Sequence, residues 1–122
     1  MEKPEIYLGN DLIEVSRILS LINTNGKKFL DRIFSKVEQE YCQSKQIPSI
    51  HYAGRFAAKE AIIKAVKSSG YIQPIPFNSI EIISGDYGEP IVKLGDQNYG
   101  KCRVSISHTE FIAMASAIYI IS

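Results

Sequence analysis

The sequence has no tryptophan and only two cysteines among its 122 residues. Cys42 and Cys102 form neither a C-x-x-C pair nor a zinc-binding spacing, so a disulfide framework and a cysteine metal site are both excluded. We expect two reduced thiols in a cytoplasmic protein. The net charge is only +1, so no overall field attracts nucleic acid or an acidic membrane. Any acidic partner must bind a local basic patch.

Long hydrophobic runs are also missing. No segment approaches the ~20 apolar residues that a membrane helix needs, and the apolar run 111–121 predicts a buried strand. The N-terminal residues Met-Glu-Lys-Pro-Glu carry charge and proline where a signal peptide needs apolar residues. Hydrophobic residues make up 45% and charged residues 22%, which is typical of globular proteins. We therefore expect one domain over residues 1–122, with a modest core.

The order of the elements predicts an α+β fold. A strand and several helices come first, and antiparallel strands follow after a loop that contains Gly70 and two prolines. Ser35, with Glu38 three residues later, has the pattern of a capping box at a helix start. In chain order we predict a strand at 5–8, helices at 11–22, 27–34, 35–44 and 50–68, and strands at 79–84, 91–94, 103–107 and 111–120.

The long helix at 50–68 carries the most informative segment, Arg-Phe-Ala-Ala-Lys-Glu-Ala at 55–61. On a helical wheel, Arg55 and Lys59 fall within the same arc as the apolar side chains. Charges on an apolar face need partners or must extend to the solvent. The alanines cover much of the opposite side and allow close approach of another element. We expect this helix to be packed on more than one side.

Two carboxylates can be interpreted in two ways. Glu60 and Lys64 have the i, i+4 spacing of an exposed ion pair worth ~0.2–0.5 kcal/mol. Asp11, with Glu14 three residues later, has the spacing of a helix-capping pair. Spacing alone favours these structural roles, and His108, in a turn, is equally ambiguous. Together, however, two carboxylates suit a hard metal ion and the nearby cations suit phosphate, which indicates phosphoryl chemistry.

Four segments together resemble one family, the holo-acyl-carrier-protein synthases, which are small single-domain phosphopantetheinyl transferases. The segments occur in the family's order and span most of the chain. They are residues 9–14 (GNDLIE), residues 29–34 (FLDRIF) with 40–42 (EYC), residues 55–61 (RFAAKEA) and residues 104–109 (VSISHT).

The resemblance implies a reaction. Such an enzyme moves the phosphopantetheine arm of coenzyme A to a serine of apo acyl carrier protein, releases adenosine bisphosphate, and supports fatty acid biosynthesis. Asp11 and Glu60 match the family's carboxylates for Mg²⁺, and Lys64, one turn after Glu60, is placed to meet a phosphate. These three residues are the catalytic candidates. Either Glu60 or a metal-held water accepts the serine proton.

The resemblance also implies binding residues for coenzyme A. Ser107, His108 and Thr109 match part of the family's nucleotide pocket, and Lys64 and Arg55 are further phosphate candidates. The family assembles as a homotrimer with sites between subunits, built from a long helix on a mainly antiparallel sheet.

Carrier docking is expected on the first helix region. Arg17 matches the family's basic residue there, and Lys27 and Lys28 extend the patch toward an acidic carrier. The loop at 67–77 departs from the family, because Phe77 stands where a tryptophan is usual. Two other functions remain open: a magnesium-dependent phosphotransferase acting on another nucleotide-bearing substrate, and a non-catalytic module that binds coenzyme A or a carrier.

Overall fold

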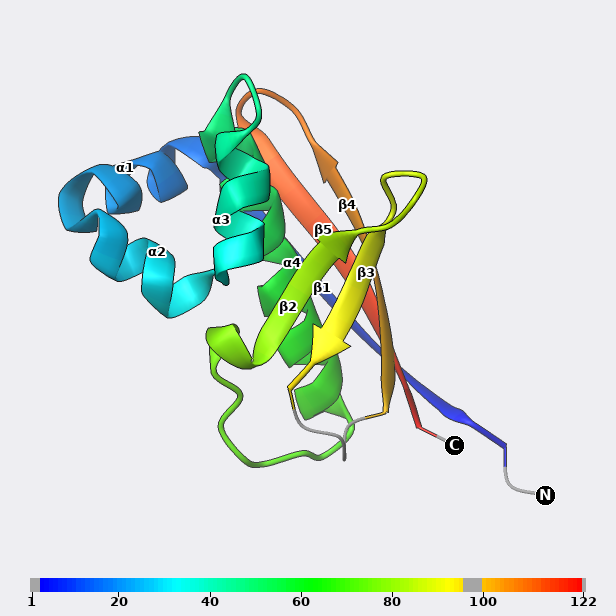
Figure 1. Ribbon diagram of the computed structural model, residues 1–122. Coiled ribbons are helices and arrows are strands. Elements are labelled where there is room, and N and C mark those ends of the chain that lie inside the picture. Colours follow the sequence, from blue (N-terminus) through cyan, green and yellow to red (C-terminus); the bar gives the residue numbers. More distant parts are fainter. Residues whose placement is uncertain (1–2, 96–99, 122) are drawn as a thin grey trace.

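A long helix lies across a three-stranded antiparallel sheet at the centre of the computed structural model, which describes residues 3–95 and 100–121. The helix is α4 (Pro48–Ser68), and the strand order is β1 (Glu5–Glu14), β5 (Ile112–Ile121), β4 (Lys101–His108) (Figure 1). Every second residue of β5 from Ala113 to Tyr119 is buried. Three of these four are alanines, which allows the helix to lie close to the sheet.

A second, two-stranded sheet is formed by β2 (Ile80–Ser84) and β3 (Pro90–Leu94), after the short helix η1 (Phe77–Ser79). Strand β3 contacts β4, so the hairpin lies beside the edge of the larger sheet (Figure 1). Helices and antiparallel sheets together confirm the predicted α+β class. No helix in residues 3–95 and 100–121 combines the length and apolar character of a membrane span.

Three shorter helices lie together beside α4: α1 (Val15–Asn25), α2 (Lys27–Ile33) and α3 (Lys36–Gln43) (Figure 1). Gly26 ends α1 with a φ of 57°, and its N–H donates to Ile22 O at 2.7 Å. The predicted capping box of α3 is confirmed. Glu38 N donates to Ser35 Oγ at 3.2 Å, and Ser35 N donates to a Glu38 carboxylate oxygen at 2.8 Å.

The N-terminal prediction was wrong about where the strand ends. Strand β1 pairs with β5 over ten residues and continues to Glu14, and α1 begins only at Val15. The predicted stop at Gly9 has another cause: an added Cβ there would lie 2.0 Å from Ala61 O of α4. Glycine is needed at this position for close approach, and not for a turn. Asp11 is therefore a strand residue opposite Ala115 and not a helix cap.

The face of the larger sheet that points away from α4 is apolar and open. On β1 its members include Leu8 and Leu12, which are 69% and 66% exposed. On β5 they include Met114, which pairs with Leu12. We call this surface the open sheet face; its exposed apolar residues are Ile6, Leu8, Leu12, Ile112 and Met114.

Candidate active site

The predicted catalytic residues Asp11, Glu60 and Lys64 come together where β1 crosses α4. We call them the carboxylate site. Lys64 Nζ lies 3.1 Å from Asp11 Oδ1 and also donates to Asn10 O at 3.0 Å. In the part of the chain that the structure describes, Lys64 thus pairs with the strand, and the i, i+4 pair with Glu60 is not formed. Because Asp11 does not cap a helix, its carboxylate is available for this cluster.

Electrostatics link the two carboxylates. Partial burial raises the pKa of Glu60, and the negative charge of Asp11 raises it further, while Lys64 and Arg17 lower it. The two carboxylates repel each other, and the one half-exposed lysine beside them pairs with Asp11. Such a site favours an added cation.

The donor set of the carboxylate site fits magnesium. In residues 3–95 and 100–121, no group of three or more His, Cys, Asp or Glu side chains could hold a metal. Mg²⁺ does not need such a group, because it keeps several waters and commonly takes one or two carboxylates together with substrate phosphates. Asp11 and Glu60 supply two hard oxygen ligands of this kind.

The predicted docking residues lie on neighbouring helices. Arg17 is an exposed residue of α1 whose charge reaches Glu60. Lys27 and Lys28 begin α2, and Lys27 forms an exposed 3.3 Å ion pair with Asp31. Because Asp31 partly neutralises Lys27, Arg17 is the stronger candidate for contact with an acidic partner near the carboxylate site.

Arg55 and His108 meet at a second place, a pocket of about 210 Å³ between α3, α4, β4 and the β2–β3 loop. We call it the anion pocket; the polar and glycine residues that line it are Tyr41, His51, Gly54, Arg55, Gly88 and His108. Arg55 is only 7% exposed. Its guanidinium lies 4.3 Å from the centre of the Tyr41 ring, and Nη2 donates to Ser84 Oγ at 3.2 Å.

Arg55 lacks an anionic partner. Among the described residues no carboxylate forms an ion pair with it, and its buried Nε has no hydrogen-bond partner. A buried cation in this state is costly unless a ligand supplies the missing charge. Phosphate is the ligand chemistry that a planar, multi-donor guanidinium fits best.

The predicted Ser107-His108-Thr109 turn needs correction, because Ser107 and His108 belong to β4. Ser107 pairs with Met114 and faces the open sheet face, whereas His108, one residue on, lines the anion pocket. Thr109 Oγ1 accepts from the N–H groups of Phe111 and Ile112 at 3.1 Å and closes the turn. Of these three residues, the anion pocket contains only His108.

Sequence reasoning missed His51. This residue lies one helical turn before Arg55, and its ring meets His108 edge to face at a centroid distance of 5.7 Å. The i, i+4 spacing from Arg55 was the signal that could have found it.

Lys59 is a structural residue. It is fully buried, and its Nζ lies 2.7 Å from Glu38 Oε1, 2.6 Å from Ile33 O and 3.3 Å from Phe77 O. The other Glu38 oxygen accepts from Ile82 N at 2.8 Å. Burial lowers the pKa of Lys59, and Glu38 opposes that shift. This pair joins the helical layer to α4 and the hairpin, and leaves no donor for a phosphate.

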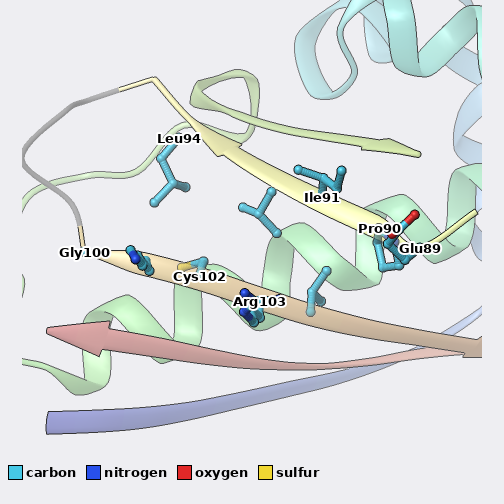
Figure 2. A pocket seen from close by; sticks show the side chains of 10 residues that line it. Glu89, Pro90, Ile91, Leu94, Gly100, Cys102 and Arg103 are labelled. Carbon is cyan, nitrogen blue, oxygen red and sulfur yellow. The ribbon is translucent and has the colours of Figure 1, made fainter. Parts of the chain in front are cut away.

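A larger cavity lies elsewhere, as a groove of about 690 Å³ between β3 and β4 (Figure 2). Apolar side chains such as Ile91 and Leu94 line one side, and Cys102 lies on the other. Burial raises the pKa of the Cys102 thiol to about 12, so it stays protonated and unreactive at neutral pH. None of the predicted site residues lines this groove.

The structure therefore divides the predicted site into two clusters. At ~100° per residue, Arg55 and Glu60 point ~140° apart around α4. The carboxylate site lies on the side covered by β1, and the anion pocket lies on the side of α3 and the hairpin. A single chain thus presents the carboxylate site on one side of α4 and the anion pocket on another.

Comparison with known proteins gives one consistent result. The sequence profile of the 4'-phosphopantetheinyl transferase superfamily matches residues 7–117. A holo-[acyl-carrier-protein] synthase from Protochlamydia amoebophila is 41% identical over 117 residues, which cover 92% of this chain and 95% of that protein. The enzyme of the same name from Chlamydia pneumoniae is 41% identical over 118 residues, which cover 93% of this chain and 95% of that protein.

Solved structures agree with the sequence relatives. An ACPS–coenzyme A complex from Chronobacterium ammoniagenes superimposes with a TM-score of 0.83 at 26% identity, and covers 97% of this chain and 98% of its own. Helicobacter pylori holo-[acyl-carrier-protein] synthase in complex with coenzyme A superimposes with a TM-score of 0.80 at 29% identity. The match covers 93% of this chain and 99% of the Helicobacter pylori chain.

Proposed function

Because this chain belongs to the 4'-phosphopantetheinyl transferase superfamily, we propose that it is a holo-[acyl-carrier-protein] synthase. It transfers phosphopantetheine from coenzyme A to a serine of apo acyl carrier protein and releases adenosine bisphosphate. The observation that carries this assignment is the carboxylate site, in which Asp11, Glu60 and Lys64 from two distant segments converge. Residues 1–122 act as one domain, in the cytoplasm, and supply holo carrier for fatty acid biosynthesis.

The carboxylate site is suited to attack on a pyrophosphate. The serine oxygen bonds to the phosphorus that bears pantetheine, and the bond from that phosphorus to the bridging oxygen breaks, so adenosine bisphosphate leaves with that oxygen. Charge neutralisation and alignment dominate such reactions. When bound, Mg²⁺ on Asp11 and Glu60 supplies charge neutralisation for the pyrophosphate. Lys64 Nζ, half exposed beside Asp11, is placed to contact a phosphate oxygen.

The serine proton needs an acceptor at the same place. Two groups are candidates: Glu60, whose pKa is raised first by burial and then by the charge of Asp11, and a water that a bound metal would hold.

The anion pocket would bind the nucleotide end of coenzyme A. Arg55 has a buried Nε without a partner, and His108 lines the same pocket. The Helicobacter pylori relative was solved with coenzyme A, which supports a nucleotide site in this fold.

A homotrimer would combine the two clusters. They point to different sides of α4, so a neighbouring subunit is needed to bring an anion pocket next to a carboxylate site. The open sheet face, with Leu8 and Leu12 more than half exposed, provides an apolar surface for such contact. Each active site would then take its metal ligands from one subunit and its nucleotide contacts from another.

The carrier would dock next to the carboxylate site. Arg17 on α1 is exposed and close enough to influence Glu60, and Lys27 and Lys28 extend the basic surface onto α2. This local patch explains how a chain of net charge +1 can bind an acidic partner.

Intact-mass spectrometry of apo acyl carrier protein with coenzyme A, Mg²⁺ and the protein tests the proposal. We expect the carrier to gain one phosphopantetheine, and the Glu60→Gln variant to give no gain. If several carriers stay unmodified while the protein cleaves another nucleotide-bearing substrate, the phosphotransferase alternative is correct. Coenzyme A binding without any reaction would instead indicate a non-catalytic module.

A further inference from the structure

Both histidines of the chain stand in the anion pocket. His51 comes from α4 and His108 from the end of β4, and their rings meet at 5.7 Å with an interplanar angle of 70°. The His51 ring also meets the Tyr41 ring of α3 edge to face at 5.9 Å. Packing from both sides therefore fixes the His51 imidazole next to the buried Arg55.

Positive charge surrounds this histidine pair. Arg55 on α4 lines the pocket, and Lys45, just after α3, lies 4.6 Å from the centre of the Tyr41 ring. The β2–β3 loop contributes Gly88 and the start of β3 contributes Pro90, neither of which is charged, and among the described residues no Asp or Glu lines the pocket. The described lining of the pocket thus contains one cation and two imidazoles without an acidic side chain to balance them, and a second cation, Lys45, lies over the neighbouring Tyr41 ring.

Proton binding to His51 is disfavoured as a result. Burial is the main cause that lowers the pKa of His51, and His108, Lys45 and Arg55 lower it further. A bound phosphate has the opposite effect, because a nearby negative charge favours the protonated imidazole.

We propose that His51 is a proton-coupled part of the nucleotide site beside His108, and that its imidazole takes up a proton when the phosphate-bearing end of coenzyme A enters the anion pocket. This inference rests on the proposed function. It adds His51 as a binding residue and gives it a role in pH dependence.

The sign of the effect follows from the direction of the shifts. Without ligand, the pKa of His51 lies below its ordinary value of 6.5, and the bound anion raises it. At a pH between the pKa of His51 in the free protein and its pKa in the complex, binding of the anion is accompanied by uptake of a proton. The dissociation constant of the anion therefore falls as the pH falls. Each proton taken up changes the affinity by up to about tenfold per pH unit. A phosphate group itself binds a proton near pH ~6. The measurement of proton uptake by the protein therefore has to be made above that pH.

Calorimetry with 3',5'-adenosine bisphosphate, the leaving group of the proposed reaction, measures this coupling. Titrations in two buffers of different ionisation enthalpy, at about pH 6.5 to 8.5, give the protons taken up on binding. We expect net uptake by the wild type and a smaller uptake by His51→Phe, which keeps the edge contact with Tyr41. Lys36→Gln, which removes an exposed cation outside the pocket, should match the wild type.

The outcomes separate this inference from the proposed function. If the bisphosphate binds the wild type with no proton uptake, or if His51→Phe takes up as many protons as the wild type, the histidine proposal is overturned and the transferase assignment stands. If the bisphosphate binds at no pH, the nucleotide site itself is wrong. Because the chain has only two histidines, NMR titration of the wild type resolves His51 and gives the same answer without a variant: the pKa of His51 must rise on binding.

Discussion

Replacing Lys59 with methionine tests whether the ion pair with Glu38 is a structural link. Both side chains are fully buried at a 2.7 Å separation, and Lys59 also bonds two carbonyl groups, those of Ile33 and Phe77. Methionine fills the apolar part of the space but leaves the Glu38 carboxylate buried without a cation. Removing one partner of a buried pair costs about 3–5 kcal/mol, so we expect a loss of this size in the free energy of unfolding.

A second substitution distinguishes buried charge from lost packing. In the double variant Lys59→Met with Glu38→Gln, the uncompensated charge is gone, and the amide can still accept a hydrogen bond from Ser35 N or Ile82 N. We therefore expect the double variant to be more stable than Lys59→Met alone, by about 1–3 kcal/mol.

Urea denaturation followed by circular dichroism, at one fixed protein concentration, measures these differences. Lys67→Met is the matched control, because Lys67 is an exposed lysine of the same helix and should change stability by no more than about 0.5 kcal/mol. A Lys59→Met variant as stable as this control would refute the structural role of the Lys59–Glu38 pair.

Four further predictions concern the site and the assembly. Glu60→Gln and Asp11→Asn should each abolish transfer by mass spectrometry while the melting temperature stays near that of the wild type; retained activity in either would remove that residue from the carboxylate site. Arg17→Glu should raise the KM for the carrier and leave the KM for coenzyme A nearly unchanged, and an equal rise in both would contradict docking on α1. Leu8→Asp should lower the molar mass measured by light scattering to that of a monomer, so an unchanged mass would argue against contact through the open sheet face. Gly9→Ala should destabilise the fold by several kcal/mol in thermal unfolding, because the new Cβ would lie 2.0 Å from a backbone oxygen of α4.

Local signals in the sequence predicted most of the helices. The capping box at Ser35 is an interaction between residues close in the chain, and it is present. The Asp11 region was misjudged because helical spacing and a capping pattern also occur by chance in a strand. Only the ten-residue pairing with β5 decides between them, and those partners lie about a hundred residues away.

The site was predicted in parts. Motif resemblance named Asp11, Glu60 and Lys64, which the fold does bring together. It could not place Arg55 and His108 on another side of α4, because that separation depends on how the helix is oriented on the sheet. The same limit hid the Lys59–Glu38 pair, since capping explained Glu38 and nothing local connected it to Lys59.

We propose that one active site combines the carboxylate site of one subunit with the anion pocket of another. Mixing two inactive variants, Glu60→Gln and His108→Glu, tests it directly. The new carboxylate at position 108, an exposed position, repels the nucleotide phosphates without disturbing the core. After subunit exchange, we expect recovery of about a quarter of wild-type transfer, because about one interface in four then combines an intact Glu60 with an intact His108. If exchange is confirmed and the mixture stays as inactive as its components, the site is not shared between subunits.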